Sequence, residues 1–576
     1  MKNLDQHLHK YIVDSTDRIY NPQENAVWRY ILRQLKSFLS KNAHSSYLDG
    51  LKSTGITLEE IPKIEYISQH LSRFGWSAQP VSGFIPPAVF MEMQAANILP
   101  IASDMRSFDQ ILYTPAPDIV HEAAGHAPML ACQPYSDYLK KYAAVAKKAI
   151  VSHEDIEIYK AIRKLSDLKS QSDVTQEEIQ AVQNHLDHVS SNISYLSEAA
   201  LLSRMNWWTA EYGLIGSLDD PKIFGAGLLS SIAEAKHCLS PEVKKLPLTI
   251  DCINYSYDIT EQQPQLFVTP DFSHLGVVLD ELSKQMAYQV GGLTGLEKAA
   301  KAQATCTAEL NSGLQISGRV VEYIRDSLSE VGFLKFAGPC QLSIKGQQLP
   351  SHSTDLHPNG YSTPLGYLKA FPNKCPSMLT EKEWQQIQIN LNQKSKIKLE
   401  FTNGVVITGE LHSSLKEGSQ TLLLTLDHAH VSFEGRDLYL PEWGRFDLAL
   451  GTKVTSVFGG PADRIAYGEF EEFEVTRIPK RKYSAKDYKI FGYYEILRDL
   501  RHGKKTPYDL ETCVRLAKDE LPHEWLIFIE SLEIAKANSF KNIEELCLQH
   551  LRSIESHPDV KSCIQDGIQL SHLMEV

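Results

Sequence analysis

The stretch of sequence that says most about this chain reads His121-Glu122-Ala123-Ala124-Gly125-His126-Ala127-Pro128. It combines two imidazoles with a carboxylate, but it breaks the H-E-x-x-H spacing of zinc proteases, in which both histidines share one helix face. Histidines five residues apart lie about 140° from each other around an ideal α-helix. A regular α-helix therefore cannot aim both side chains at one ion.

Gly125 indicates how the two histidines can still meet. Glycine tolerates the left-handed or otherwise unusual backbone that ends or distorts a helix, so we expect Gly125 to bend the chain and return His126 toward the side that His121 faces. Asp118 precedes the motif as a candidate helix cap, and Pro128 blocks simple continuation of the helix. The motif predicts a pair of histidine ligands to one metal ion, placed across the end of a helix. The chain has 21 histidines, however, and the spacing alone does not decide between a metal site and ordinary histidines.

The composition is that of a globular protein with more than one domain. A chain of 576 residues, 43% of them hydrophobic, is long enough to fill several cores. It has no apolar run that could cross a bilayer and no secretory signal at its start. Its nine cysteines contain no C-x-x-C pair and fit reduced thiols better than disulfides or a structural zinc site. We expect a cytoplasmic protein, without a membrane partner. Its net charge of −13 disfavours nucleic acid as a partner.

The first part of the chain is expected to be mainly helical. Residues 25–39 and 64–74 carry apolar side chains at helical spacing. Residues 154–200 are polar and helix-prone, with a break at 172–174 and a capping box at Thr175-Gln176-Glu177-Glu178. We expect a helical hairpin on the surface there.

After about residue 300 the pattern changes to strands. Residues 396–402 alternate with period two, Asn403-Gly404 is a type I′ turn signal, and residues 405–411 return, which predicts a β-hairpin. Further strand signals, typical of a small antiparallel sheet or barrel, lie at 422–426, 431–433, 454–457 and 470–475. Residues 508–573 again show helical spacing. We expect a mainly α region, then a β-rich region, then a helical C-terminal region.

A catalytic metal needs a third ligand, and Glu211 is the candidate. Redox iron is commonly held by two histidines and one carboxylate, which leaves positions open for oxygen and substrate. Glu211 lies in an otherwise apolar, aromatic segment four residues after Trp207, so both side chains would face one pocket. The alternative is a core carboxylate bonded to an arginine or to the backbone, and these residues alone leave that alternative open.

Three motifs in order carry a family resemblance. Residues 113–128, the run Trp207-Trp-Thr-Ala-Glu-Tyr-Gly-Leu214, and the run Gly225-Ala-Gly-Leu-Leu-Ser-Ser-Ile-Ala-Glu234 resemble the pterin-dependent aromatic amino acid hydroxylases. The resemblance begins near Tyr20 and runs to about Ala287, roughly half of the chain. It implies the following division: an N-terminal lead at 1–19, a mainly α catalytic domain of the hydroxylase type at 20–300 with a helical insertion at 154–200, a β-rich domain of unknown role at 301–480, and a helical C-terminal region at 481–576.

The resemblance implies an iron(II) monooxygenase that hydroxylates the ring of an aromatic amino acid with dioxygen and tetrahydrobiopterin or a related tetrahydropterin. Phenylalanine to tyrosine is the first choice, because a short catalytic core is typical of the phenylalanine-type members; tryptophan or tyrosine hydroxylation stays open. The residues that match the catalytic iron ligands are His121, His126 and Glu211. Those that match substrate-binding residues are Arg106, which would hold the substrate carboxylate, Asp118, which would steady Arg106, and Thr114, Trp207 and Ser230.

The resemblance also points to a pterin site. The matching residues are Phe84, Ile85, Phe90 and Glu122, of which Phe90 would stack on the pterin ring. Pro86 and Pro87 replace the small polar residues that are common there, and neither has an N–H group to donate.

Three features depart from the family pattern. The resemblance starts almost at once, so we expect no amino-terminal regulatory domain. The connection from His126 to Trp207 is a few dozen residues longer than usual, and the hairpin expected at 154–200 would either cover the pocket or make a subunit contact. The C-terminal half does not resemble the tetramerisation tail of the animal members, so the oligomeric state stays open.

Two function classes compete with the hydroxylase. A zinc hydrolase would use Glu122 as general base and would be active with zinc and without pterin. A binding module would take its role from the β-rich and helical half of the chain, with a vestigial iron core. The intact set of His121, His126, Glu211, Arg106 and Trp207 speaks against a dead site.

Overall fold

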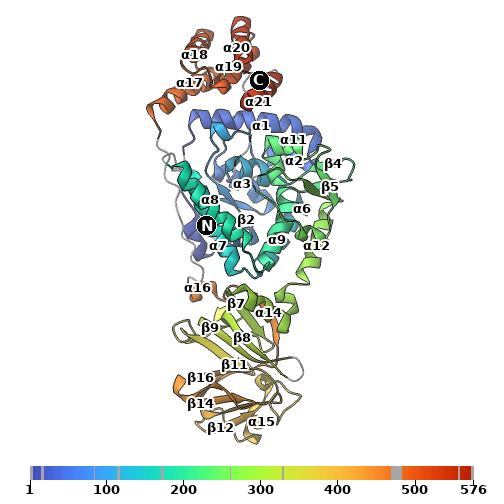
Figure 1. Cartoon of the computed structure of the whole chain (residues 1–576), viewed down its shortest axis with the longest axis vertical. Helices are drawn as coiled ribbons and strands as arrows, with labels where there is room; N and C mark the ends of the chain where they lie inside the picture. Colours follow the sequence, from blue (N-terminus) through green and yellow to red (C-terminus); the bar gives the residue numbers. More distant parts are fainter. Residues whose placement is uncertain are drawn as a thin grey trace.

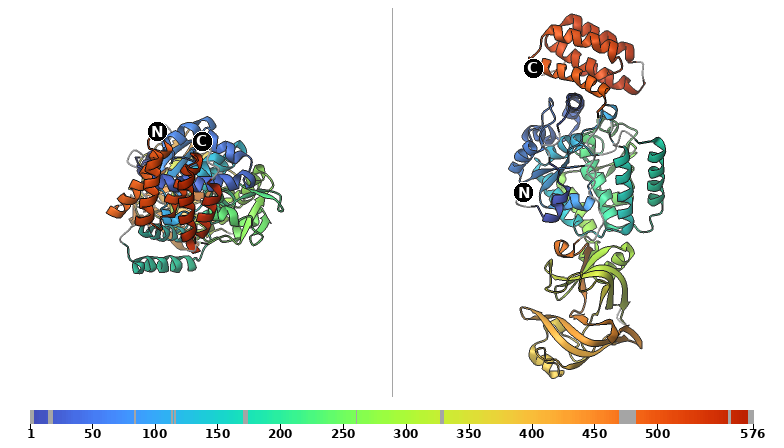
Figure 2. Two further views of the ribbon diagram at one scale, coloured as in Figure 1. Left: turned by 90° about the horizontal axis from the view of Figure 1, so that it is seen from above. Right: turned by 90° about the vertical axis from the view of Figure 1, so that its left-hand side faces the viewer.

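The computed structural model describes residues 4–14, 19–82, 85–112, 114, 117–169, 174–259, 261–326, 330–468, 483–555 and 558–571. Three parts are stacked along the long axis of the molecule, as Figure 1 and Figure 2 show. The amino-terminal, mainly helical part lies in the middle, the β-rich part lies at one end, and the C-terminal helices lie at the other. The order in space therefore differs from the order in sequence.

The middle part is built around α1 (Pro22–Asn42), which covers the helix expected at 25–39. Asn21 and Glu24 form a capping box at its start, and Pro22 occupies the first turn, where a missing N–H group costs nothing. The other helices are α2 (Ser46–Ser53), α3 (Ile64–Leu71), α4 (Pro87–Ala95), α5 (Ala127–Met129), α6 (Gln133–Ala146), α9 (Glu198–Asn206), α10 (Ala226–Leu229), α11 (Ile232–His237), α12 (Phe272–Ser283), α13 (Ala287–Val290) and α14 (Gly292–Ala302).

Two small sheets accompany these helices. The strands β1 (Ser77–Val81) and β2 (Ile98–Ala102) form a parallel pair. The second sheet has the order β4 (Pro221–Ile223), β3 (Leu214–Gly216), β6 (Gln265–Thr269), β5 (Lys244–Pro247). Short 3₁₀ turns are η1 (Gln6–Tyr11), η3 (Ser72–Phe74), η4 (Phe108–Gln110) and η7 (Ile250–Asn254). The helix expected at 64–74 is thus α3 followed by η3.

The expected helical hairpin is confirmed as α7 (His153–Lys169) and α8 (Gln176–Ser191). Thr175 and Glu178 form the predicted capping box at the start of α8. The inner helix, α7, buries Ile156, Tyr159 and Leu165, whereas most of α8 is exposed. Figure 2 shows α8 on the outer side of the middle part.

The β-rich part consists of two antiparallel sheets. The first has the order β10 (Gln347–Gln348), β9 (Val331–Ile344), β8 (Leu314–Arg325), β7 (Thr305–Leu310), β17 (Val454–Gly459), and β11 (Gly360–Pro364) also pairs with β9. The second has the order β12 (Lys396–Glu400), β13 (Val405–Glu417), β14 (Gln420–Phe433), β15 (Arg436–Tyr439), and β16 (Phe446–Ala449) also pairs with β14. Short helical elements are η8 (Pro376–Met378), α15 (Glu381–Gln386), η9 (Pro441–Trp443) and α16 (Arg464–Tyr467).

The hairpin predicted around Asn403-Gly404 is confirmed, because β12 and β13 pair in antiparallel register. The prediction of a type I′ turn is wrong, because that turn requires a positive φ at both central residues and only Gly404 has one, +93°. The Gly404 N–H group donates to Phe401 O at 3.1 Å. The strand signals at 422–426 and 431–433 belong to one long strand, β14. The signal at 470–475 lies outside the described residues.

The C-terminal region is helical, as expected, and packs on α1. Its helices are α17 (Ala485–Arg501), α18 (Pro507–Glu520), α19 (Trp525–Ala537), α20 (Lys541–Ile554) and α21 (Pro558–Leu570). The indole of Trp525 meets the ring of Tyr30 edge to face at 5.1 Å. The hydrophobic core of these helices is continuous with that of the middle part, whereas each β sheet has a core of its own.

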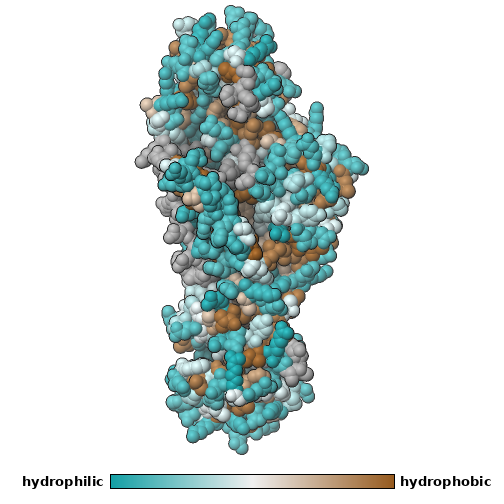
Figure 3. Space-filling view, in the orientation of Figure 1, coloured by the Kyte–Doolittle hydropathy of each residue, from teal (hydrophilic) through white to brown (hydrophobic). Residues whose placement is uncertain are grey.

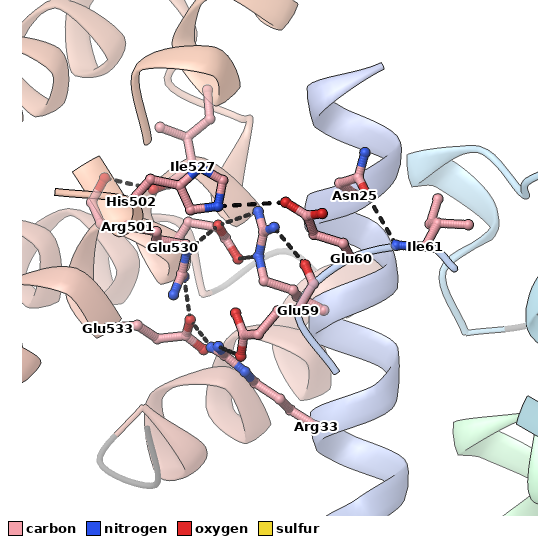
Figure 4. A network of polar contacts seen from close by, with 12 residues as sticks. Asn25, Arg33, Glu59, Glu60, Ile61, Arg501, His502, Ile527, Glu530 and Glu533 are labelled. Atoms are coloured by element: carbon pink, nitrogen blue, oxygen red, sulfur yellow. Dashed lines mark hydrogen bonds and ion pairs between the residues drawn. The ribbon is translucent and has the colours of Figure 1, made fainter. Parts of the chain in front are cut away.

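A buried ion network joins α19 to α1, as Figure 4 shows from close by. The Glu530 carboxylate accepts hydrogen bonds from Arg29 Nη2 at 2.8 Å and from Arg501 Nε at 3.0 Å. Glu533 pairs with Arg501 and with Arg33. Burial alone would raise the pKa of Glu530, but the two guanidinium groups outweigh it and lower that pKa to about 2.

The face drawn in Figure 3 is mostly hydrophilic, with smaller hydrophobic areas between. Among the helices of the described residues, none combines the length and the apolar character that a membrane span requires.

Candidate active site

The two motif histidines lie on a π-helical turn, η5 (Val120–His126). A π-helix bonds residue i to residue i+5, so its wider turn brings residues five apart onto one side. The Nε2 atoms of His121 and His126 are 3.1 Å apart. Gly125 does not adopt a left-handed backbone, because it has no positive φ, and the expected distortion of the helix is the π-helical turn itself. The expected helix end is wrong, because helical backbone continues through Pro128 into α5.

Gly125 has a different role, which is close packing. A Cβ atom at this position would lie 2.6 Å from Ala226 O, at the start of α10. Only glycine therefore lets η5 approach α10 this closely. The same contact holds η5 beside the loop that carries Ser230.

Glu211 completes a cluster of three ligand groups. It ends a second π-helical turn, η6 (Trp207–Glu211). Its two carboxylate oxygens lie 3.3 Å from His121 Nε2 and 3.3 Å from His126 Nε2. All three ligand atoms fall within 4.8 Å of one another. Two imidazoles and one carboxylate in this arrangement suit a divalent iron ion and leave part of its coordination sphere open.

Two effects oppose each other at Glu211. Burial alone would raise the pKa of its carboxyl group. The neighbouring imidazoles of His126 and His121 outweigh burial and hold the pKa well below its usual range. The group is therefore an ionised carboxylate near neutral pH, which is the form that coordinates metal.

Ser230 orients His121. The Ser230 hydroxyl donates to Ala226 O at 2.7 Å, so its oxygen accepts from His121 Nδ1, 3.1 Å away. The proton of His121 is thereby held on Nδ1, and the lone pair of Nε2 faces Glu211 and His126. This is the arrangement of a metal-binding histidine with a supporting hydrogen bond.

Arg106 and Asp118 form a buried, bidentate ion pair. Arg106 Nε lies 2.7 Å from Asp118 Oδ2, and Arg106 Nη2 lies 2.8 Å from Oδ1. Asp118 Oδ1 also accepts from the backbone N–H group of His121 at 3.1 Å, as expected of a helix cap. Burial alone would raise the pKa of Asp118, but the Arg106 guanidinium outweighs it and lowers that pKa. Asp118 therefore links the arginine to the turn that carries the histidines.

These side chains line one cavity of about 2250 Å³. Its volume exceeds the roughly 300–1,000 Å³ of most small-molecule pockets, so it has room for more than one ligand. The cavity contains every site residue predicted from the sequence except Phe84, which lies outside the described residues; its lining includes Ile85, Phe90, Arg106, Thr114, Asp118, His121, Glu122, His126, Trp207, Glu211 and Ser230.

Trp207 is held between two tyrosines that sequence reasoning missed. Its ring stacks on Tyr257 at 4.3 Å and on Tyr212 at 4.5 Å. Its indole Nε1 atom is buried and has no hydrogen-bond partner among the described residues. Tyr212 directly follows the Glu211 motif and could have been suspected, whereas Tyr257 is 50 residues away and gave no signal.

Glu122 and Phe90 lie near the second histidine. The ring centroids of Phe90 and His126 are 6.5 Å apart. Burial raises the pKa of Glu122 to about 8, and its Oε2 atom has no hydrogen-bond partner within the described part of the chain. A buried polar atom without a partner is costly, so this oxygen suits a polar group of a ligand.

Two further segments contribute to the cavity wall. Ile156, Tyr159 and Ile162 reach it from α7, and Tyr483 and Phe491 reach it from the C-terminal region. The contribution of α7 had a signal in the sequence, because its apolar residues recur every three residues inside a polar stretch. The two aromatic residues of the C-terminal region gave none.

The sequence profile of the family described as biopterin-dependent aromatic amino acid hydroxylases matches residues 9–162 and 182–291. The unmatched stretch between them, 163–181, holds the end of α7 and the start of α8. The helical hairpin is thus the place where this chain departs from the profile.

Curated relatives align with a little under half of the chain. The phenylalanine-4-hydroxylase of Mesorhizobium japonicum is 28% identical over 263 residues, which are 45% of this chain and 79% of the relative. That of Pseudomonas aeruginosa is 26% identical over 265 residues, 46% of this chain and 84% of the relative. A crystal structure of Chromobacterium violaceum phenylalanine hydroxylase with iron(III) and 7,8-dihydrobiopterin covers 49% of this chain and 90% of its own, with 23% identity and a TM-score of 0.37.

Proposed function

Residues 9–162 and 182–291 belong to the biopterin-dependent aromatic amino acid hydroxylases, and on that basis we propose that the protein hydroxylates L-phenylalanine to L-tyrosine. The reaction would use iron(II), a tetrahydropterin and dioxygen. The observation that carries this proposal is the convergence of His121, His126 and Glu211 in the cavity. We assign the catalytic domain to residues 20–300, with the helical insertion at 154–200, and the β-rich and helical regions to 301–480 and 481–576.

The three converging groups would hold the iron ion. Their donor set, two neutral imidazoles and an ionised carboxylate, fits iron(II) and leaves coordination positions open on the cavity side. When bound, iron and tetrahydropterin together supply the activation of dioxygen, and the pterin supplies two electrons. The chain's own residues position the ligands and the substrate for this chemistry.

Arg106 would bind the carboxylate of the amino acid. Asp118 occupies Nε and one hydrogen of Nη2, so the guanidinium keeps donors for a second anion. Because the Asp118 pair fixes the plane of the guanidinium, little side-chain entropy is lost when the substrate binds. Arg106 also lies beside the Ser230 loop, with Nη1 3.4 Å from Ser230 O, which places the substrate carboxylate near the His121 side of the iron site.

Trp207 and Thr114 would form the seat of the aromatic ring. The stack of Tyr212, Trp207 and Tyr257 holds the indole in one orientation, and a fixed aromatic wall orients a substrate ring. Both Trp207 and Thr114 lie in the cavity wall with Arg106. An amino acid bound at Arg106 would therefore direct its ring along this wall.

Ile85, Phe90 and Glu122 would bind the pterin, with Phe84 as a fourth candidate. Phe90 offers an aromatic face close to His126. The unpartnered Oε2 atom of Glu122 can accept a hydrogen bond from a pterin N–H group when ionised or donate one when protonated. The wall supplied by α7 and by Tyr483 and Phe491 would limit the entry of water. Exclusion of water would keep the oxidation of the pterin coupled to hydroxylation of the substrate ring.

The test is an anaerobic loading with iron(II), followed by oxygen, a tetrahydropterin and each aromatic amino acid in turn. We expect tyrosine from phenylalanine, with coupled oxidation of the pterin. Hydroxylation of tryptophan or tyrosine in place of phenylalanine would keep the reaction and change the substrate. Absence of ring hydroxylation with all three, or hydrolytic activity with zinc and no pterin, would refute the proposal.

A further inference from the structure

A second group of metal-binding side chains lies in the β-rich part, outside the region that the family profile matches. His352 and His357 belong to the loop between β10 and β11, next to the first sheet, and Asp447 belongs to β16 of the second. All three side chains are buried, and their ligand atoms lie within 4.8 Å of one another. Among the described residues, only this group and the candidate active site bring three such ligands together.

The distances within this group suit a small divalent ion. His352 Nδ1 lies 3.4 Å from His357 Nε2, and His357 Nε2 lies 3.9 Å from Asp447 Oδ2. Two ligands bound to zinc at about 2.0–2.2 Å with a tetrahedral angle are about 3.3 Å apart. The imidazole pair already has about this spacing, and the Asp447 carboxylate would reach it relative to His357 with a shift of about half an ångström.

Asp447 is held in place from its other side. Its Oδ1 atom accepts a hydrogen bond from Thr425 Oγ1 at 2.6 Å, and its backbone oxygen accepts one from Tyr361 Oη at 2.6 Å. Its Oδ2 atom, which faces the imidazoles, makes no hydrogen bond to any residue in the described part of the chain. Carboxylate oxygens are common ligands of divalent cations, so this oxygen can take a cation on the side of the imidazoles.

Both imidazole rings are shielded from solvent. Burial lowers the pKa of both, to about 4 for His357, and the opposing effect of Asp447 is smaller. The 3.9 Å between His357 Nε2 and Asp447 Oδ2 is longer than a hydrogen bond, so a direct bond between these two side chains does not account for the arrangement. Neutral imidazoles offer a lone pair to a metal without losing a proton first.

We propose that His352, His357 and Asp447 bind one zinc-type divalent cation, with water as a further ligand. The set of two imidazoles and one carboxylate is a recurrent zinc site with three protein ligands. Because the ligands come from both sheets of the β-rich part, the bound ion would fix the two sheets to each other. This site is independent of the iron site and of the hydroxylase activity.

The test counts zinc ions bound by the full-length, metal-depleted protein. Because two imidazoles and a carboxylate also bind zinc, we expect the candidate active site to take one equivalent as well. We therefore expect two equivalents for the wild-type protein, one for Glu211→Ala, one for His357→Ala and one for Asp447→Asn. Asp447→Asn keeps the oxygen that accepts from Thr425 and the volume of the side chain, so we expect this variant to fold. It therefore tests the site even if His357→Ala does not fold. The matched control is His412→Ala, which breaks a partly buried histidine–aspartate pair of the second sheet and should leave two equivalents.

A second measurement uses Glu211→Ala protein, in which only the proposed site is left. We expect Zn(II) to raise the unfolding midpoint of this protein and Co(II) to give the intense visible bands of a four-coordinate site, and we expect both effects to disappear when Asp447→Asn is added. One equivalent in the wild-type protein, lost in Glu211→Ala and kept in His357→Ala, would overturn the proposal. Two equivalents in Asp447→Asn would overturn the role of the carboxylate.

Discussion

His121 and His126 lie five residues apart in the sequence, yet their Nε2 atoms are only 3.1 Å apart, because the chain between them forms a π-helical turn. Glu211 meets them from a second π-helical turn. Both turns that carry the candidate metal ligands thus depart from regular α-helical geometry. Such turns are rare and often occur at functional sites.

The contact between Gly125 and Ala226 should be required for this geometry. In Gly125→Ala the new Cβ atom would lie 2.6 Å from Ala226 O, so backbone must shift. We expect a loss of about 1–3 kcal/mol of stability and weaker binding of iron(II). Urea unfolding and iron titration measure these effects. In Gly492→Ala, where a Cβ atom would meet nothing within 4 Å, the helix α17 should gain stability, and equal behaviour of the two variants would contradict the packing role of Gly125.

The hydroxyl of Ser230 should set the metal affinity of His121. Ser230→Ala removes the acceptor for His121 Nδ1, and loss of a supporting hydrogen bond of this kind typically costs about 10- to 100-fold in metal affinity. The measurement is a competitive iron(II) titration. Ser531→Ala is the control, because Ser531 donates to the carbonyl four residues earlier, as Ser230 does, but lies in α19. Unchanged affinity in Ser230→Ala would exclude this role.

Asp118 should act on the substrate through Arg106. Asp118→Asn keeps an acceptor for the His121 N–H group but removes the charge that orients the guanidinium. A hydrogen bond to a charged group is worth about 1.5–3 kcal/mol, so we expect KM for phenylalanine to rise about 10- to 100-fold, with a smaller change in kcat. Steady-state kinetics separates the two constants. Asp280→Asn, which removes an exposed partner of Lys141, should leave KM as it is. A fall in kcat alone would argue against substrate positioning.

Because of the ion network between α19 and α1, the free energy of unfolding should depend on pH. The pKa of Glu530 is about 2 in the folded chain, against about 4.3 for an unperturbed glutamate. Its stabilising contribution is therefore complete above about pH 4.3 and is lost as the pH falls toward 2. Glu530→Gln leaves Arg29 and Arg501 without their buried partner, and we expect a loss of about 3–5 kcal/mol near neutral pH that narrows in acid.

Unfolding followed from pH 7 to pH 3 measures this difference. Glu495→Gln, which breaks an exposed pair with Arg498, should change stability by less than about 1 kcal/mol at any pH. A constant difference between Glu530→Gln and the wild-type chain over the whole range would show that the pKa of Glu530 is the same in the folded and the unfolded chain.

Local sequence signals predicted several elements because those elements depend on neighbouring residues. The capping box at Thr175 and Glu178 and the glycine turn before β13 are examples. The π-helical turns could not be predicted, since the same residues are compatible with an α-helix and only packing against α10 selects the wider turn. The long strands β8 and β9 also escaped, because buried strands lack a clear alternation.

The candidate site was predicted residue by residue where side chains lie close to the motifs. His121, His126, Glu211 and Arg106 all lie in the cavity. Tyr257, Tyr483 and Phe491 could not be assigned to it, because they reach the cavity through tertiary packing over long sequence separations. Local patterns do not report such contacts.

The most direct test of the account is the origin of the oxygen atom in the product. Iron(II)-loaded protein, a tetrahydropterin and phenylalanine are exposed to ¹⁸O₂, and the product is analysed by mass spectrometry. The account predicts tyrosine that carries one labelled oxygen atom, formed in step with pterin oxidation and lost in Glu211→Ala together with the bound iron. Unlabelled product, or full activity in Glu211→Ala, would contradict it.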